Sequence, residues 1–150
     1  MKKLLILGAG TAGTMMANHL RKKLNKKDWD ITIVDERKEH YYQPGFLFVP
    51  FGIYQPSDTV KDISKFIPGG VGLLQKRIEK VKPSENVVEL EGGEQLHYDV
   101  LIAATGAKSA PEEIEGMAGS EWYKSVFDFY TYEGAVALGE KLKNWQGGKL

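Results

Sequence analysis

The stretch Lys3-Leu4-Leu5-Ile6-Leu7-Gly8-Ala9-Gly10-Thr11-Ala12-Gly13 decides the fold of this chain. An apolar run of strand length leads directly into the pattern Gly-x-Gly-x-x-Gly, and a helical pattern follows at once. In a dinucleotide-binding turn, Gly8 permits the tight turn, Gly10 lets the backbone approach a pyrophosphate, and Gly13 lets the helix pack closely on the sheet. The free N–H groups and the dipole at the start of that helix favour an anion. The stretch therefore predicts a dinucleotide-binding strand–turn–helix unit.

Two further features lie where this kind of unit requires them. Ala17, one helical turn beyond Gly13, keeps the helix face that meets the sheet small. The next apolar strand, Ile31–Val34, ends at Asp35, whose carboxylate is placed for a ribose hydroxyl. The alternative is a plain strand–helix turn whose glycines occur by chance, and both features disfavour it.

The composition is that of an ordinary globular domain. The 150 residues are 42% hydrophobic and 27% charged, with 20 basic and 20 acidic side chains. A net charge of zero gives no reason to expect a nucleic-acid partner, and no apolar run approaches the length of a membrane span. Because Met1-Lys2-Lys3 leads straight into a strand, we expect no secretory signal and a cytoplasmic location. The absence of cysteine excludes disulfides, thiol catalysis and thiolate metal sites, and we name no metal ligand.

Periodicity and turn residues predict the order of the remaining elements. The tight turns at 83–86 and 92–93 indicate an antiparallel meander, because a parallel return needs a longer crossover. The strand that ends in Ala104-Thr105-Gly106 is continuously apolar, so we expect it to be buried on both faces. The expected elements are a helix over about 11–25, a short helix over 59–66 capped by Asp58, strands within 71–74, 75–81, 86–91, 94–98 and 98–106, a connector over 107–119, an amphipathic helix marked by Ala135, Leu138, Leu142 and Trp145, and a further strand beginning at Lys149-Leu150.

The segment His40–Tyr54 is dense in aromatic and turn residues and has no clean period. It predicts either the wall of a pocket for a flat ring system or a packed loop that closes the core. His40 has two interpretations, a proton relay or a hydrogen-bonded structural histidine. His97, in a meander strand, is interpreted as structural, and His19 as a surface or hydrogen-bonded residue rather than a ligand.

Four signals follow one another along the chain: the glycine turn with its acid, the aromatic segment, the meander, and the strand ending in Ala-Thr-Gly. In this order they resemble the FAD-binding domain of the pyridine nucleotide-disulfide oxidoreductase superfamily. Within it, His40–Phe46 and Phe127–Thr131 look most like sulfide:quinone oxidoreductases and flavocytochrome c sulfide dehydrogenases. The resemblance implies an α/β, Rossmann-like FAD-binding domain over 1–150, with a parallel sheet and an antiparallel β-meander. It implies that this domain is the first part of a longer protein.

The resemblance also implies which residues contact FAD. The pyrophosphate would lie at the glycine turn, the adenosine ribose at the acid, the flavin ring at the aromatic segment, and the adenine at a meander strand. Carried over position by position, the cofactor-binding residues are Gly8, Gly10, Thr11, Ala12, Gly13, Asp35, Glu36, Tyr42, Gln43, Pro44, Ile78, Ala104, Thr105 and Gly106.

The missing cysteines narrow the activity that the resemblance implies. Disulfide reductases of the superfamily carry a redox Cys pair in this region, and some sulfide:quinone oxidoreductases carry a cysteine near Trp122–Ser125; this chain has neither. The redox cysteines, the second dinucleotide domain and the segment that meets quinone and membrane are therefore expected beyond Leu150. We name no catalytic residue among the 150 positions.

The implied function is the FAD-binding portion of a sulfide:quinone oxidoreductase, which passes electrons from sulfide to a quinone. A type II NADH:quinone dehydrogenase and a nucleotide-binding module without activity are the alternatives. Alone, the chain is expected to bind FAD weakly or not at all and to self-associate through an open sheet edge or face. Contact with a membrane, peripheral at its inner face, is expected only through the parts beyond Leu150.

Overall fold

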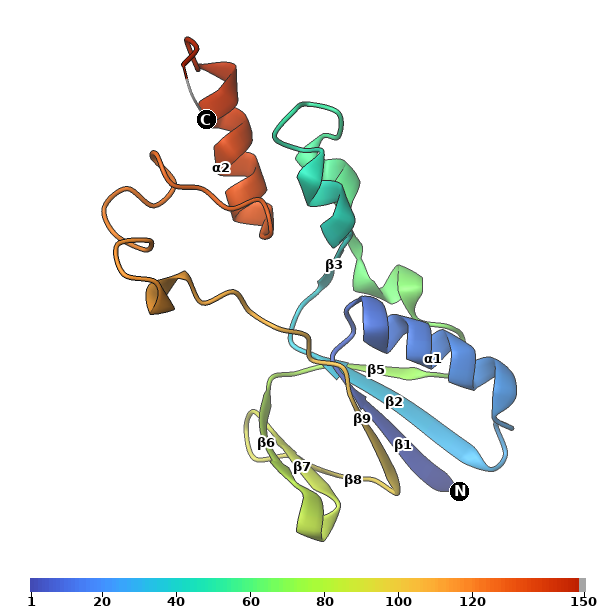
Figure 1. Ribbon diagram of the computed structural model, residues 1–150. Coiled ribbons are helices and arrows are strands. Elements are labelled where there is room, and N and C mark those ends of the chain that lie inside the picture. The colour runs from blue at the N-terminus through green and yellow to red at the C-terminus, as the bar shows by residue number, and fades with distance from the viewer. Residues whose placement is uncertain (149–150) are drawn as a thin grey trace. The chain divides into compact units, whose positions relative to one another are not determined.

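The computed structural model describes residues 1–148, and the chain divides into two compact units. Unit 1 comprises Met1–His40 and Asp62–Ala107, and unit 2 comprises Tyr41–Lys61 and Lys108–Leu150. A two-stranded ribbon, β3 (Glu39–Tyr41) paired with β4 (Val60–Asp62), forms where the chain passes between the units. Each unit is described by itself below (Figure 1).

A four-stranded parallel sheet in the order β5-β2-β1-β9 forms the middle layer of unit 1. Leu7 pairs with Val34 on one side and with Ala103 on the other, so the carboxyl ends of the three strands meet at one edge of the sheet. The glycine turn begins at that edge. The strands are β1 (Lys2–Leu7), β2 (Trp29–Asp35), β5 (Gly72–Gln75) and β9 (Val100–Ala103).

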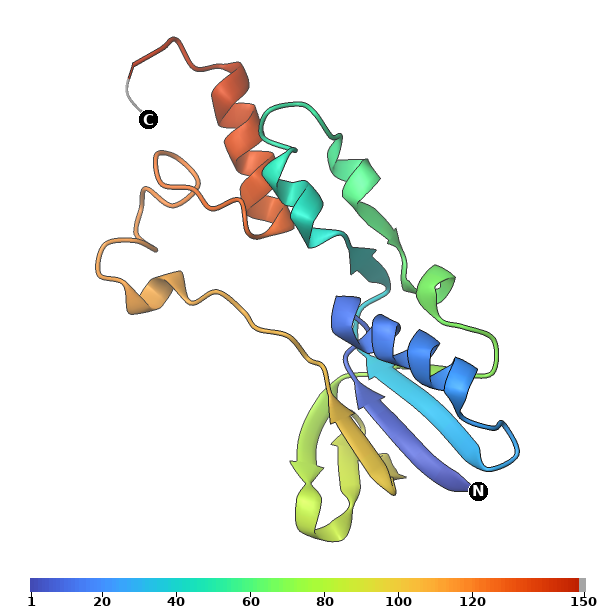
Figure 2. The same ribbon diagram turned by 45° about the vertical axis from the view of Figure 1, so that its right-hand side comes forward.

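Helix α1 (Thr11–Lys23) covers one face of this sheet, and a meander covers the other (Figure 2). Successive side chains of a strand point to opposite faces, so β1 contributes Leu4 and Ile6 to the cluster that contains Ala17 of α1. It contributes Leu5 and Leu7 to the cluster that contains the meander residues. The meander consists of β6 (Ile78–Lys82), β7 (Val87–Leu90) and β8 (Gln95–His97), in that order and antiparallel.

Unit 2 has a smaller core, built between helix α2 (Tyr132–Lys143) and the 3₁₀ helix η1 (Gln43–Leu47). Its buried members are Phe46, Val49 and Ala135. Gly139 of α2 lies close to this segment, since a Cβ there would stand 3.4 Å from Pro50 Cα. The other 3₁₀ helices of the chain are η2 (Pro56–Thr59), η3 (Ile63–Phe66), η4 (Pro83–Glu85) and η5 (Pro111–Glu113).

Most of the expected elements are confirmed. The glycine turn leads into a helix that ends at Lys23, and Ala17 on its inner face is completely buried. The meander turns where expected: Asn86, Gly92 and Gly93 all have positive φ. The segment 107–119 carries only η5, and the amphipathic helix at the end of the chain is α2. The further strand expected at Lys149-Leu150 lies outside the described residues.

The expected helix over 59–66 is wrong. The segment instead runs from η2 through strand β4 into η3. Asp58 caps nothing downstream: it accepts from the Gln55 N–H at 2.9 Å, within the first turn of η2. Asp62 caps η3 by accepting from the Ser64 N–H at 2.8 Å. The two short helices have separate N-caps, Gln55 and Asp62, with β4 between them, so no continuous helix forms.

Two expected strands also need correction. The segment 75–81 contains a strand boundary, because Gln75 ends β5, which pairs with β2 in the parallel sheet, and β6 begins only at Ile78. The strand expected over 98–106 extends over Val100–Ala103 alone, and no residue of it is fully buried. Val100 is 40% exposed because β9 is an edge strand, paired on one side with β1.

The free edge of β9 is predicted to mediate self-association. Among the described residues no strand pairs with its outer side, and exposed edges of this kind template pairing with another chain. The Ala104 N–H donates to Leu7 O at 2.8 Å, so by strand alternation the N–H of the exposed Ala103 points outward. Ala103→Pro should therefore reduce concentration-dependent association, measured by sedimentation velocity.

Ala103→Ser is the matched control, because it keeps the N–H and a small side chain. It should associate like the wild type. A chain that stays monomeric at all concentrations, or a proline variant that associates as strongly as the wild type, would contradict this prediction.

Asp128 holds the segment that precedes α2 through several hydrogen bonds. Its Oδ1 accepts from the N–H groups of Tyr130 at 2.8 Å and Thr131 at 2.7 Å, and its Oδ2 accepts from the Tyr123 hydroxyl at 3.0 Å. The Thr131 hydroxyl in turn accepts from the Gly134 N–H at 3.0 Å and caps the helix. Burial raises the pKa of Asp128, but the hydrogen bonds from Thr131, Tyr123 and Tyr130 outweigh it, so the pKa lies below its ordinary value.

This lowered pKa predicts how stability depends on pH. The charged Asp128 stabilises the fold at pH values above the unfolded pKa of about 3.9, and that contribution is lost as the pH falls through the folded pKa. Asp128→Asn should lower the free energy of unfolding by about 1–2 kcal/mol near pH 7, since hydrogen bonds to a charged group are weakened. In urea titrations the difference from the wild type should shrink as the pH is lowered below about 4, because Asp128 becomes protonated and its charge no longer contributes. The exposed Glu112→Gln is the control; an Asp128→Asn deficit that does not change with pH would refute the assignment.

Candidate dinucleotide site

Close backbone contacts require glycine at two of the three glycine positions in the turn. Gly8 has φ +93°, and a Cβ there would collide with the carbonyl oxygen of Ala104. A Cβ at Gly13 would collide with the carbonyl oxygen of Gly8. Strand β9, the turn and the first turn of α1 can therefore come together only with glycine at both positions.

Gly10 has a different environment. It is the N-cap of α1, with φ −69° and ψ −165°, and a Cβ built there meets nothing within 4 Å. No side chain caps the helix, and its first turn contains no acidic residue. The next two residues, Thr11 and Ala12, are exposed. The helix start thus presents free backbone N–H groups to an open space that a side chain at Gly10 would fill, and this fits the phosphates of a dinucleotide.

Asp35, at the end of β2, is hydrogen-bonded to the turn itself. Its Oδ2 accepts from the Ala9 N–H at 2.7 Å, and its Oδ1 accepts from the Arg37 N–H at 2.9 Å. Each carboxylate oxygen has a second lone pair, so a ribose hydroxyl can still donate to it. Glu36 beside it is exposed. The predicted ribose-binding acid therefore also fixes the backbone of the turn, a role that the sequence pattern did not indicate.

The Ala104-Thr105-Gly106 element lies against the same turn. The Ala104 N–H donates to Leu7 O at 2.8 Å, which continues the pairing of β9 with β1. A Cβ at Gly8 would stand 2.9 Å from Thr105 Cα. Gly106 has φ +75°, so the chain turns away through a left-handed conformation as soon as it has passed the glycine turn.

His40 is a neighbour of the turn that sequence reasoning did not assign to it. Its Nδ1 lies 3.2 Å from Ala9 O. Its ring packs on Phe66 with centroids 4.3 Å apart and an interplanar angle of 32°. No motif links positions 9 and 40, so only the folded structure shows this contact.

The remaining predicted residues divide between the units. Ile78 begins β6 and packs against the cluster that contains Leu7 and Val34, at the carboxyl ends of β1 and β2. Tyr42, Gln43 and Pro44 belong to unit 2 and are exposed. The structure thus brings the glycine turn, Asp35, Glu36, Ile78 and Ala104–Gly106 together within unit 1, and describes the predicted flavin-ring residues separately.

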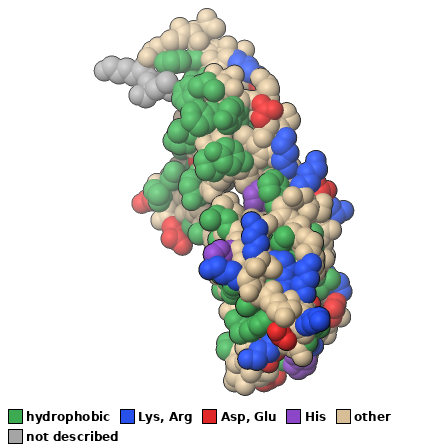
Figure 3. Space-filling view, turned by 90° about the vertical axis from the view of Figure 1, so that its right-hand side faces the viewer, with side chains coloured by type: hydrophobic (Ala, Val, Ile, Leu, Met, Phe, Trp, Pro, Cys, Tyr) green, Lys and Arg blue, Asp and Glu red, His purple; other side chains and the backbone are tan. Residues whose placement is uncertain are grey.

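The packed-loop interpretation of the aromatic segment is confirmed for two of its residues, and the wall of a ring pocket stays a prediction. Phe46 and Val49 are buried in the core of unit 2, as a packed loop requires. Phe51 and Ile53 are each 65% exposed and contribute to an apolar surface. Figure 3 shows hydrophobic side chains gathered in the upper part of the view.

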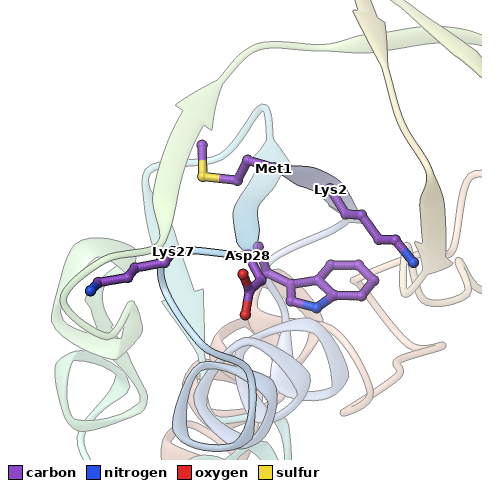
Figure 4. Close-up of a pocket in the computed structure, with 5 residues that line it drawn as sticks. Met1, Lys2, Lys27 and Asp28 are labelled. Atoms are coloured by element: carbon purple, nitrogen blue, oxygen red, sulfur yellow. The ribbon is translucent and has the colours of Figure 1, made fainter.

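One hollow of the described residues lies far from this site. A hollow of about 380 Å³ lies at the amino ends of β1 and β2, away from the glycine turn (Figure 4). Lys2 Nζ stands 5.6 Å from the Trp29 ring centroid, and Figure 4 shows Lys27 directed to the opposite side. Within residues 1–148, no group of His, Cys, Asp and Glu could hold a metal ion, and no helix is long and apolar enough to cross a membrane.

Comparison with known proteins gives one consistent result. A sequence profile of the pyridine nucleotide-disulphide oxidoreductase family matches residues 2–144. The mitochondrial sulfide:quinone oxidoreductase of Dictyostelium discoideum is 31% identical over 148 residues, which are 99% of this chain and 32% of that protein. The type II NADH:quinone oxidoreductase of Staphylococcus haemolyticus is 32% identical over 124 residues, 77% of this chain and 29% of that protein.

A solved structure agrees with these relatives. The sulfide:quinone oxidoreductase of Aquifex aeolicus superimposes with a TM-score of 0.76 at 25% sequence identity, covering 95% of this chain and 32% of that one. The chain spans about a third of the length of the curated relatives it matches.

Proposed function

We propose that this chain, which belongs to the pyridine nucleotide-disulphide oxidoreductase family, is the FAD-binding portion of a flavin-dependent oxidoreductase. The observation that carries the proposal is the open space at Gly10. A Cβ added there would meet nothing within 4 Å, and no side chain caps the helix that starts there. The steric fit of Gly8 and Gly13 around it supports the same conclusion.

In this proposal the chain's own residues bind and orient the cofactor. The backbone from Gly10 to Gly13 holds the pyrophosphate, Asp35 and Glu36 bind the ribose, and Ala104–Gly106 closes the site beside Gly8. Tyr42, Gln43 and Pro44 toward the flavin ring, and Ile78 toward the adenine, remain predictions. Bound flavin would accept electrons from the donor and pass them to the acceptor. No residue of this chain is assigned a catalytic role.

For the whole protein we propose sulfide oxidation with a quinone as the acceptor. Sulfide:quinone oxidoreductases of Dictyostelium discoideum and Mus musculus match 99% and 97% of this chain, whereas the type II NADH:quinone oxidoreductase of Staphylococcus haemolyticus matches 77%. That dehydrogenase activity is the second candidate, because its identity of 32% is comparable. We place the redox cysteines, the quinone site and any peripheral membrane contact outside this chain, in a protein of the cytoplasm or the inner membrane face.

A titration with FAD tests the proposal on the chain itself. Chemical-shift changes of the backbone N–H groups of residues 9–13, followed by NMR, detect weak binding, which is what we expect of this portion alone. Gly10→Val should abolish the shifts, because its side chain fills the space the pyrophosphate needs, while circular dichroism stays native.

Wild-type shifts that are absent, or that persist in Gly10→Val, would overturn the cofactor site.

A longer sequence that contains this chain decides between the two activities. A cysteine in the strand after Leu150 favours sulfide oxidation, and a second Gly-x-Gly-x-x-Gly with NADH contacts favours the dehydrogenase. Addition of sulfide or NADH to the FAD-loaded chain should reduce no flavin, since the chain contains no cysteine and we place the second dinucleotide domain outside it.

A ribose contact at Asp35 predicts a specific pattern of affinities. Asp35→Ala should weaken binding by about 1–3 kcal/mol through loss of a charge-assisted hydrogen bond. Because Asp35 also holds Ala9, the ribose contribution must be separated from the effect on the turn. Wild type and variant are therefore each titrated with ADP and with 2′-deoxy-ADP, which forms a double-mutant cycle.

If Asp35 binds the 2′-hydroxyl, the deoxy probe binds more weakly than ADP to the wild type and equally to Asp35→Ala. Glu36→Ala, titrated in parallel, reports whether the neighbouring carboxylate shares the contact. If the ratio of the dissociation constants for 2′-deoxy-ADP and ADP is the same in wild type and Asp35→Ala, Asp35 does not bind the 2′-hydroxyl. Its role would then be limited to holding the turn.

A further inference from the structure

The peptide between Ala9 and Gly10 occupies the centre of the glycine turn. In a trans peptide the C=O and N–H point in opposite directions, so the direction of the Ala9 carbonyl determines where the Gly10 N–H points. A flip of this peptide would turn the carbonyl oxygen toward the open space at Gly10 and repel an anion there. Glycine on the carboxyl side makes such a flip inexpensive, because glycine tolerates almost any backbone conformation.

One side chain opposes that flip. His40 Nδ1 lies 3.2 Å from Ala9 O, and since a carbonyl oxygen only accepts, the hydrogen bond requires a proton on Nδ1. The Asp35 carboxylate accepts the Ala9 N–H, but that group belongs to the preceding peptide. Asp35 therefore fixes the Gly8–Ala9 peptide, and His40 fixes the Ala9–Gly10 peptide.

The His40 ring is itself held in place by the element next to α1. It packs on Phe66 of η3 at a centroid distance of 4.3 Å. The carbonyl of Phe66 accepts from Asn18 Nδ2 at 2.8 Å, and the same amide donates to Thr14 O at 2.9 Å within α1. The histidine, η3 and the first half of the helix thus form one connected support around the turn.

We propose that His40 is a positioning residue for the dinucleotide site, which holds the Ala9–Gly10 peptide in the orientation that presents the Gly10 N–H to an anionic phosphate. This inference rests on the proposed function for the identity of the anion. It assigns His40 neither to proton relay nor to packing alone, the two roles that the sequence suggested.

Two substitutions separate the hydrogen bond from the packing. His40→Phe keeps an aromatic ring on Phe66 and removes the donor. His40→Asn restores a donor, because its Nδ2 lies as far along the side chain as the imidazole Nδ1. His97→Phe, on the exposed strand β8 of the same unit, is the matched control.

Two measurements are made on the whole chain by NMR. Without ligand, NMR relaxation dispersion of the Gly10 and Thr11 amides reports conformational exchange with the flipped peptide, whose population should rise about threefold to tenfold in His40→Phe, the effect of losing one hydrogen bond. The dissociation constant for ADP should rise by about the same factor. His40→Asn should stay within about twofold of the wild type in both, and His97→Phe should match the wild type.

Each outcome decides one question. Unchanged exchange and ADP affinity in His40→Phe would overturn the positioning role. A loss in His40→Asn as large as in His40→Phe, or larger, would show that a donor at the Nδ position is not what holds the peptide and would also overturn it. A wild type that does not bind ADP contradicts the proposed function instead, and relaxation dispersion alone then decides whether His40 holds the peptide.

Discussion

The close approach of the Gly8 backbone to two neighbours is the constraint on which unit 1 depends. Strand β9 reaches Gly8 through the Ala104 carbonyl, and helix α1 reaches it through Gly13, with no room for a Cβ at either glycine. This contact determines where the helix starts relative to the strands. It therefore aims the uncapped N-terminus of α1 across the carboxyl edge of the sheet, where parallel α/β folds bind their ligands. The packing that forms the fold and the geometry that suits a phosphate are consequences of the same steric requirement.

The layers on either side of the sheet allow that edge to stay open. The alternation along β1 gives Leu4 and Ile6 to the helix side and Leu5 and Leu7 to the meander side, so both faces are covered. Because the inner face of α1 is small at Ala17, the helix lies close to the strands. Hydrophobic burial is thus concentrated in the middle of the sheet, and polar contacts such as that from Ala9 to Asp35 are left for its edge.

The sequence predicted those parts of the fold in which one residue type has one physical role. Glycines with positive φ, the apolar strands and the tight meander turns all appear where their local chemistry placed them. It failed where tertiary pairing competes with local preference. The segment around Val60 joins a ribbon with β3 instead of a helix, and Gly72–Gln75 joins the parallel sheet instead of the meander. For the site, the pattern identified the turn and its acid, but no local signal could bring His40 or Phe66 to Ala9, since those contacts join positions far apart in the chain.

Pre-organisation explains why a carboxylate can serve a site that must also bind an anion. Asp35 is engaged by the N–H groups of Ala9 and Arg37, so much of its charge is already compensated by the backbone before any ligand arrives. The same bonds hold the turn rigid, and a rigid turn loses less conformational entropy when a ligand binds. The two glycine-flanked peptides would otherwise be the most mobile in the unit, because glycine loses the most freedom on ordering. The glycines that make close approach possible thus create the need for side chains that restrain them, and in this chain those side chains come from the end of β2 and from β3.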